Sequence, residues 1–203
     1  FYYPEGNQYG VKMNSYWGVP ISAMSIQIYY NKELFRKAGL DPEKPPKTWK
    51  AFIAAGEQLN KKGIPALSIG FGDLWMIGAF LEPYAFSYLG AEKLKGSMLG
   101  KVPYTDPAWE KVLKCFTDLK DHDLLVKGCV TSPNKESEQL FSGGLCAMIM
   151  NGSWGVSVFK GMNPNLDYGV MRLPKPDDAT FPMHVRGGVG SGASVTQNSK
   201  HQK

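Results

Sequence analysis

FSGGLCAMIMNGSWG, residues 141–155, contains the clearest structural signal in the sequence. Within it, Leu145–Met150 is an apolar run of strand length, and an Asn-Gly-Ser turn signal follows at once. Ser153 is a suitable N-cap for a helix over residues 154–160. The stretch therefore predicts a buried strand that leads directly into a helix, with a large tryptophan at the junction.

The same alternation of strand and helix extends along the rest of the chain. Ile26–Tyr30 has the period-two pattern of a strand, and Asn31 can cap a helix over 32–38. Further predicted segments are a helix from Thr48 through Lys62, a strand at 65–71, a helix from Asp73 to about Tyr88 that Pro83 kinks or restarts, a helix that starts at Asp106-Pro107, a helix over 135–141, and a strand within 167–174. This order predicts an α/β fold.

Length and composition are those of an ordinary globular chain. Its 203 residues suit one large domain or two small ones, and the hydrophobic share is 43 %. The net charge of +5 comes from scattered basic residues, so nucleic-acid binding is not expected. Nor is a membrane span, because no long apolar run occurs. The start at Phe1 and the tail without a natural stop signal suggest a fragment.

The cysteines and histidines form no metal-binding pattern, and no cofactor is expected. They are Cys115, Cys129, Cys146, His122, His184 and His201. One disulfide could form, but buried thiols are expected. Cys146 lies within the apolar run and is therefore predicted to be a buried, unpaired thiol.

No catalytic motif is found. GGVGSGA at 187–193 partly fits a dinucleotide-binding pattern, but few residues follow it and none is acidic. It is also no nucleophile elbow, because Val189 and Ala193 occupy the positions that require glycine. The remaining interpretation is a strand whose backbone passes close to another group. A glycoside hydrolase with an aromatic cleft is the rival class, although no motif identifies its paired carboxylates.

Four segments occur in the order that is typical of one known family. They are YWGVP (16–20), YYNKELFRKAGLDPEKPPKTWKAF (29–52), FSGGLCAMIMNGSWG (141–155) and DYGVMRLPKP (167–176). In these segments the chain resembles the extracellular solute-binding proteins of family 1, the sugar receptors of bacterial ABC importers. The resemblance implies a periplasmic-binding-protein-like fold of two α/β lobes joined by hinge strands. It also implies that a carbohydrate binds in the cleft between the lobes, without catalysis.

The resemblance covers nearly the whole chain, but family members are about twice as long. It therefore implies a fragment that is mostly the C-terminal lobe, at 27–183. Residues 1–26 would be the end of the N-terminal lobe with the first hinge strand, and 184–203 the second hinge strand and the return to that lobe. A periplasmic or extracellular location, sometimes with a lipoprotein anchor, ABC permease subunits as partners and a monomeric state are also implied.

The resemblance assigns ligand contacts to several residues, among them Asn151. Trp154 matches the family tryptophan that follows Asn151-Gly152 and stacks on a sugar ring, whose apolar face suits a flat indole. On this interpretation Trp154 is partly exposed near Trp75, with both rings on one face. The alternative is that Trp154 closes the core. Trp75 and Asp73 match a region where an aromatic residue and an acid line the cleft, but Asp73 is equally suited to cap the helix that follows it.

The hinge segments supply the remaining candidates. Met24 stands where a maltodextrin-binding family member carries a ligand-contacting acid, which argues against a maltodextrin ligand. His184, Arg186 and Gly187 lie at the second hinge, where the two side chains could reach polar groups of the ligand. Because Arg186 and the positive net charge would tolerate an anion, a polyol or glycerol-phosphate ligand stays open beside a sugar.

Overall fold

The computed structural model describes residues 11–12, 15–16 and 19–201. These residues fall into two compact units. The main unit is Ile26–Arg186, and the ribbon unit is formed by the described parts of 1–25 and 187–203. Strand β3 (Val19–Asn31) contributes residues to both units.

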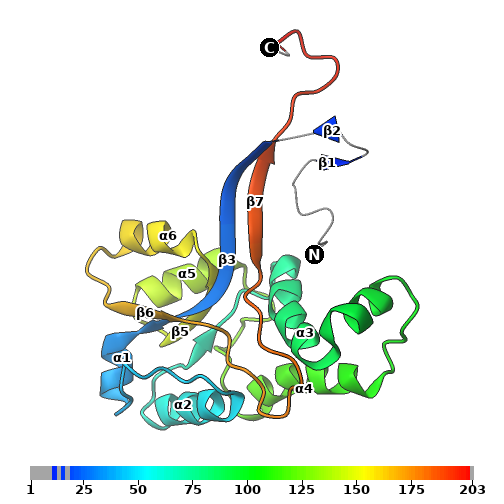
Figure 1. The fold of residues 1–203 in the computed structure, drawn as a ribbon. Coiled ribbons are helices and arrows are strands. Elements are labelled where there is room, and N and C mark those ends of the chain that lie inside the picture. The colour runs from blue at the N-terminus through cyan, green and yellow to red at the C-terminus, as the bar shows by residue number, and fades with distance from the viewer. Residues whose placement is uncertain (1–10, 13–14, 17–18, 202–203) are drawn as a thin grey trace. The chain divides into compact units, whose positions relative to one another are not determined.

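A mixed sheet with the strand order β4-β5-β3-β6 forms the centre of the main unit (Figure 1). β4 is Leu67–Ser68, β5 is Met148–Gly152 and β6 is Tyr168–Met171. β5 runs antiparallel to β3 and parallel to β4, and β6 runs antiparallel to β3. The predicted α/β class is confirmed, but β4 is much shorter than the strand predicted at 65–71.

Helices pack on both faces of this sheet. They are α1 (Lys32–Lys37), α2 (Trp49–Lys61), α3 (Leu74–Met98), α4 (Pro107–Asp121), α5 (Asn134–Ser142) and α6 (Gly155–Met162). α5 and α6 lie next to each other on one side of the sheet, whereas α1 and α2 lie on the other side (Figure 1). α3 packs on α4.

The alternating side chains of β3 account for these two layers. Tyr29 is fully buried against Phe141 of α5 and Phe159 of α6, and its ring meets that of Phe159 edge to face at 5.1 Å. Its neighbour Tyr30 points to the opposite face. There its ring lies 4.8 Å from that of Phe35 in α1. The central strand is thus apolar on both faces, as a strand between two helical layers must be.

The predicted N-caps of three helices are confirmed. Asn31, Thr48 and Asp106 each accept a hydrogen bond, at 2.9–3.3 Å, from a backbone N–H two or three residues further on. Pro107 occupies the first helical position after Asp106, as the sequence indicates. The backbone hydrogen bond from Ala108, together with Lys93, lowers the pKa of Asp106. These local signals set where the helices begin.

The break in α3 lies at Gly90 rather than at Pro83, where the sequence predicted a kink or a restart of the helix. Gly90 has φ 71°, a backbone conformation that glycine adopts at little cost. The ring of Phe181 fills the space where a β-carbon of residue 90 would lie. Pro83 is buried within the first part of the helix. The long-range contact with Phe181, which the local sequence does not reveal, therefore determines the position of the break.

The boundaries around β5 also differ from the prediction. The strand extends through Asn151 and Gly152, which pair with Gln27 and Ile26 of β3, instead of ending at Met150. The Asn-Gly pair can stay in the sheet because the Asn151 side chain is satisfied by buried polar partners. Helix α6 then begins at Gly155, with Trp154 rather than Ser153 at the N-cap position.

The ribbon unit contains the glycine-rich strand. β7 (Gly187–Ala193) pairs antiparallel with residues 19–25 of β3, and the register shifts on either side of Ser22. A β-carbon at Gly187 would lie 2.8 Å from the carbonyl oxygen of Met24. The interpretation of this segment as a strand with a close backbone approach is therefore confirmed. The short strands β1 (Val11–Lys12) and β2 (Ser15–Tyr16) pair with each other.

All three cysteines of the chain lie in its described part, where they are buried and form no disulfide. The preference for buried thiols over a disulfide is therefore confirmed. Burial raises the pKa of Cys146 to about 12. Among the described residues, no helix has the length and apolar character needed to cross a bilayer.

We predict that Cys146 reacts slowly with a thiol reagent in the native protein. Its side chain is fully buried, and the raised pKa keeps it protonated at pH 8, whereas the thiolate is the reactive form. Labelling with an aromatic disulfide reagent, followed by peptide mass spectrometry, should show modification of Cys146 only after denaturant is added. Rapid native labelling at this position, or a disulfide at Cys146, would contradict the assignment.

Candidate functional site

Two exposed tryptophans meet just beyond the end of β5. Trp154 is the N-cap of α6, and Trp75 is the second residue of α3. Their ring centroids lie 5.6 Å apart, with 60° between the ring planes, and the residues are 37 % and 41 % exposed. The predicted proximity and partial exposure are confirmed, and Trp154 does not close the core. We call these two side chains the tryptophan pair.

The tryptophans of α2 and α4 behave differently. Trp49 and Trp109 are buried, and their indole N–H groups donate to Asp118 and Ser97 at 3.0 and 2.9 Å. Their large apolar area belongs to the core of the main unit. Of the four tryptophans that the structure describes, the exposed pair is therefore the one that offers indole surface to a partner molecule.

The indole N–H of Trp154 donates a hydrogen bond to a nearly buried carboxylate. Glu138 of α5 is only 8 % exposed, and its Oε1 accepts hydrogen bonds from three side-chain N–H groups. The donors are Asn151 Nδ2 at 2.8 Å, Asn134 Nδ2 at 3.2 Å and Trp154 Nε1 at 3.3 Å. The sequence interpretation missed Glu138. Its signal is the spacing of Asn134, Glu138 and Phe141, which share one buried face of α5.

Asn151 supports this arrangement from within the sheet. It is fully buried, and its Oδ1 accepts from Asn134 Nδ2 at 3.0 Å and from the backbone N–H of Gly152 at 2.9 Å. Its side-chain N–H group donates to Glu138. The resemblance implied a ligand contact for Asn151, whereas the structure buries this side chain beneath Trp154.

Gly152 lets the Trp154 ring lie close to the backbone. A β-carbon on Gly152 would overlap the six-membered part of the Trp154 ring. The carbonyl oxygen of Gly152 accepts a hydrogen bond from the Tyr29 hydroxyl at 3.0 Å, which fixes the strand end. The Asn-Gly-Ser-Trp order thus has a steric reason, because the indole folds back over the glycine two positions before it.

Asp73 caps a helix other than the one that follows it. Its Oδ2 accepts from the backbone N–H of Asn134, the first residue of α5, at 2.8 Å. In the described structure the first turn of α3 receives no side-chain cap from Asp73. Pro133 occupies the N-cap position of α5 and offers no side-chain acceptor, so Asp73 supplies the acceptor instead. The predicted capping of α3 is therefore wrong, although a capping role is right.

The loop before the second hinge strand is tied to the helices. Asp178 accepts from the Tyr88 hydroxyl and from Lys111 Nζ, both at 2.7 Å. Lys111, followed by Tyr88, lowers the pKa of Asp178. The backbone N–H of Phe181 also donates to the Ser87 carbonyl at 2.9 Å. These contacts hold the chain against α3 and α4 before it reaches His184 and Arg186.

Arg186 and His184 both contact α3. Arg186 Nε lies 3.3 Å from Glu82 Oε2, and both side chains are about a quarter exposed. Arg186 Nη1 is buried and finds no acceptor within the described part of the chain. The ring of the exposed His184 lies 3.8 Å from that of Phe86. The other two hinge candidates, Met24 and Gly187, belong to the ribbon unit, where they occupy neighbouring positions on β3 and β7.

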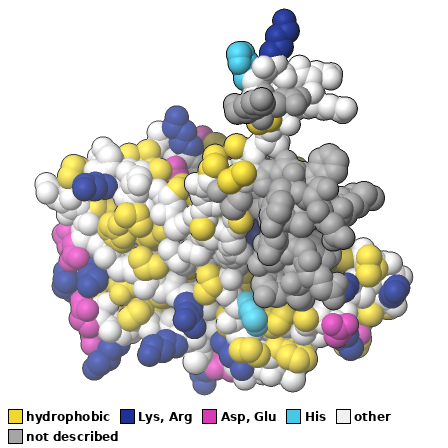
Figure 2. Space-filling model, turned by 45° about the horizontal axis from the view of Figure 1, so that its top comes forward, with side chains coloured by type: hydrophobic (Ala, Val, Ile, Leu, Met, Phe, Trp, Pro, Cys, Tyr) yellow, Lys and Arg dark blue, Asp and Glu magenta, His cyan; other side chains and the backbone are white. Residues whose placement is uncertain are grey.

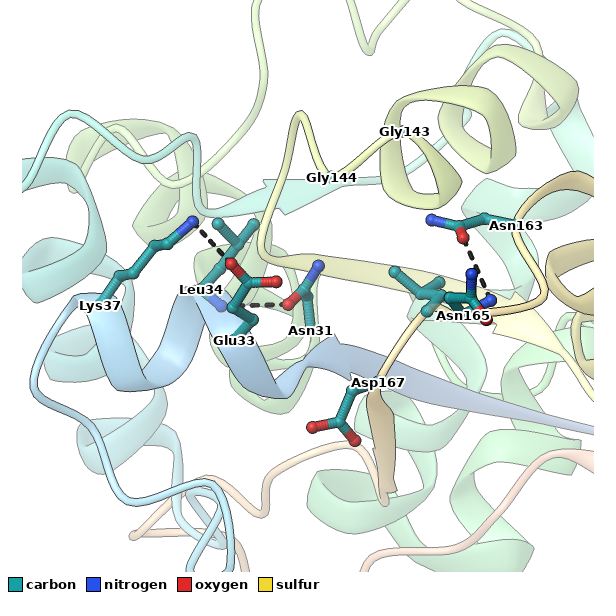
Figure 3. Close-up of a pocket in the computed structure, with 10 residues that line it drawn as sticks. Asn31, Glu33, Leu34, Lys37, Gly143, Gly144, Asn163, Asn165 and Asp167 are labelled. Atoms are coloured by element: carbon teal, nitrogen blue, oxygen red, sulfur yellow. Dashed lines mark hydrogen bonds and ion pairs between the residues drawn. The ribbon is translucent and has the colours of Figure 1, made fainter.

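A concavity lies at the opposite end of β5 from the tryptophan pair, where the chain enters the strand (Figure 3). Its volume is about 290 Å³, and its lining is mainly polar. Several of the lining groups bond to one another, including Glu33 with Lys37 at 2.8 Å and Asn163 with the backbone of Asn165 at 3.2 Å. It lacks the exposed aromatic surface of the tryptophan pair among its described lining residues.

Charges of both signs are mixed on the surface. On the face in Figure 2, Lys and Arg side chains lie beside Asp and Glu side chains, and small hydrophobic patches are scattered among them. Ion pairs such as Lys32 with Glu43 and Arg36 with Asp167 follow the same pattern. Such mixing is typical of a solvated protein surface.

Comparison with known proteins assigns the family. Residues 2–203 match the family model described as bacterial extracellular solute-binding protein. The chain belongs to this family. The match covers nearly the whole sequence and places the chain among binding proteins rather than enzymes. The predicted family resemblance is therefore confirmed.

Individual relatives differ in what their names say they bind. The sn-glycerol-3-phosphate-binding periplasmic protein UgpB of Brucella abortus is 32 % identical over 159 residues, which are 76 % of this chain and 35 % of the relative. A chitin oligosaccharide binding protein is 27 % identical, with a TM-score of 0.76 over 89 % of this chain and 45 % of its own. RafE in complex with raffinose is 23 % identical, with a TM-score of 0.79 over 97 % and 51 %.

The chain spans about a third of the length of this curated relative and about half of these solved structures. The likeness to RafE shows the fold alone, which is the mixed α/β fold of the periplasmic binding proteins. The names of the three proteins include a phosphate ester and oligosaccharides. The names of these proteins therefore do not decide the ligand class of the present chain, which has to be argued from its own residues.

We predict that Asp73→Ala lowers the stability of the main unit by about 1 kcal/mol, the typical loss for an N-cap side chain. The reason is that the first N–H of α5 loses its acceptor. Urea unfolding measures the change. Asp73→Asn, which retains an oxygen acceptor, should recover most of the loss. Unchanged stability in the alanine variant would show that Asp73 does not cap α5.

Proposed function

We propose that the chain carries the ligand-binding face of a carbohydrate receptor for a bacterial ABC importer, and that it performs no catalytic step. The observation that carries the proposal is the tryptophan pair, which exposes two indoles although a buried network holds one of them in place. The family resemblance implies that a second lobe closes over this face. The present proposal concerns only the residues of the main unit.

The geometry of the pair suits a sugar ring. A pyranose has one face of C–H groups, and an aromatic ring matches this face with little loss of conformational freedom. The 60° angle between the rings gives two surfaces that differ in direction. A sugar residue stacked on Trp154 would therefore present its edge to Trp75. By analogy with aromatic pairs, such a stack contributes about 1 kcal/mol beyond area burial.

A polyol or glycerol-phosphate ligand is the second candidate. Two observations favour it: the name of the Brucella relative and the Arg186 Nη1 group that lacks an acceptor in the described structure. However, Glu82 already balances the charge of Arg186. An N–H group of this kind can donate to a sugar hydroxyl as well as to a phosphate oxygen. We therefore place the neutral carbohydrate first.

The remaining features of the proposal follow from the family. The receptor would act outside the cytoplasmic membrane, in the periplasm or as an anchored lipoprotein. As a monomer it would deliver its ligand to ABC permease subunits. Binding the ligand and delivering it to the permease would require no cofactor and no metal ion bound to the receptor.

Calorimetric titration tests the ligand class. The protein used is the longest natural form that contains residues 1–203, and the probes are raffinose, a chitin oligosaccharide, xylan oligosaccharides and sn-glycerol-3-phosphate. We expect saturable binding of a neutral oligosaccharide, with the probe recovered intact afterwards. Binding of sn-glycerol-3-phosphate alone would select the second candidate. Cleavage of the oligosaccharide would overturn the receptor and favour the hydrolase.

We predict that Trp154→Ala in this protein weakens oligosaccharide binding at least about tenfold, which is ~1.4 kcal/mol or more. The stacking face is lost, whereas the partly exposed ring contributes less to the core than a buried one. The loss of stability should therefore stay well below the ~3–5 kcal/mol expected when a core aromatic residue is truncated.

Trp109→Ala is the matched comparison, because Trp109 of α4 is buried and donates its indole N–H to Ser97 of α3. It should destabilise the protein far more than Trp154→Ala while the folded fraction keeps its affinity. If Trp154→Ala instead unfolds the protein readily and the folded fraction binds normally, Trp154 is a structural residue.

A further inference from the structure

We propose that Glu138 is a positioning residue that sets the orientation of the Trp154 indole and links it to Trp75. The ligand readout of this proposal rests on the proposed function, but the orientation of the ring does not. The family resemblance implies a role for the tryptophan after β5 but assigns none to the nearly buried carboxylate that accepts its indole N–H.

The first argument is the chemistry of the acceptor. A single oxygen, Glu138 Oε1, receives N–H groups from Asn134, Asn151 and Trp154. Hydrogen bonds to an ionised acceptor are stronger than neutral ones, and they are stronger still away from water. The indole N–H therefore has a fixed partner on the buried side. The residue as a whole remains 37 % exposed.

The second argument is the steric support of the ring. The six-membered part of the indole lies over Gly152, where a β-carbon would overlap it. A contact at one end of the ring system and a hydrogen bond at the other restrict both side-chain torsions. A ring that is already ordered loses little freedom when a ligand stacks on it.

The third argument is the connection to the other tryptophan. Asn134 donates its side-chain N–H group to both Glu138 and Asn151, and its backbone N–H donates to Asp73. Asp73 directly precedes α3, which carries Trp75 as its second residue. The network therefore joins the end of β5, the start of α5 and the start of α3. These are the segments that hold the two indoles 5.6 Å apart.

Within the described structure, the network leaves one buried polar atom without a hydrogen-bond partner, which is energetically unfavourable. Asn134 Oδ1 is buried and meets no donor within the described structure. Buried polar atoms are normally satisfied, and an exception is a sign that another constraint determined the arrangement. Here the constraint is that the Asn134 N–H groups face the carboxylate and Asn151, which leaves the oxygen facing away.

The test uses nuclear magnetic resonance of the indole N–H groups in the longest natural form that contains this chain. Each tryptophan gives one ¹H–¹⁵N signal, and the Trp154 signal is identified by its loss in Trp154→Phe. Glu138→Leu removes the acceptor, so the Trp154 signal should shift and its proton should exchange faster with solvent. Glu138→Gln retains an oxygen acceptor and should stay near the wild-type position.

Ser137→Ala is the control on the same helix. Ser137 is buried and accepts from the Ser68 hydroxyl at 2.9 Å, so its loss perturbs α5 without removing the partner of Trp154. We expect Ser137→Ala to leave the Trp154 signal in place. Oligosaccharide affinity should fall about tenfold in Glu138→Leu, as for a lost hydrogen bond to a charged group, and less than about threefold in Glu138→Gln.

An unshifted Trp154 signal in folded Glu138→Leu overturns the proposal, and so does an equal shift in Ser137→Ala. If Glu138→Leu does not fold, Glu138→Asp decides, because it keeps the charge but withdraws the carboxylate from the indole by one methylene. Its signal must shift for the proposal to stand. If the wild-type protein binds none of the oligosaccharides, the proposed function fails, while the indole signal still decides the role of Glu138.

Discussion

The pairing of β3 along its whole length is the constraint on which the other parts of the structure depend. Residues 26–31 pair with β5 and β6 in the main unit, and residues 19–25 pair with β7 in the ribbon unit. Because β5 is held in register as far as Gly152, the chain can turn only after that residue. The position of Trp154 follows from this register. A shift by one residue would move every side chain of β5 to the opposite face.

The end of β5 combines two opposing requirements. The strand is apolar and buried, yet Asn151 brings an amide into it that needs four hydrogen-bonding partners. The structure satisfies much of this need with Glu138 and Asn134 of one helix face, and the same carboxylate then serves the Trp154 indole. The Asn151 side chain is therefore linked to Trp154 through Glu138. This link connects the end of the strand to a side chain that is partly exposed to solvent.

Local sequence signals predicted the elements well and their long-range contacts poorly. The caps Asn31, Thr48 and Asp106 act through the backbone N–H groups next to them, so a short window of sequence contains all the information. The break at Gly90 depends on Phe181, which lies far along the chain. The same difference between local signals and long-range contacts explains which part of the candidate site could be predicted. An exposed tryptophan after Asn-Gly could be recognised from the sequence, whereas Glu138 acquires its role only when α5 packs beside the end of β5.

The charge balance near α3 bears on the choice of ligand. Arg186 Nε is paired with Glu82, so the guanidinium charge that a phosphate ester would meet is already balanced. The Nη1 group of Arg186, which lacks an acceptor in the described structure, can donate to a sugar hydroxyl while Nε stays with Glu82. Glu138 Oε1 already accepts three N–H groups, and this carboxylate adds an acidic centre behind the indole. The proposal of a neutral ligand with many hydroxyl groups agrees with both carboxylates, because such a ligand adds no further negative charge beside them.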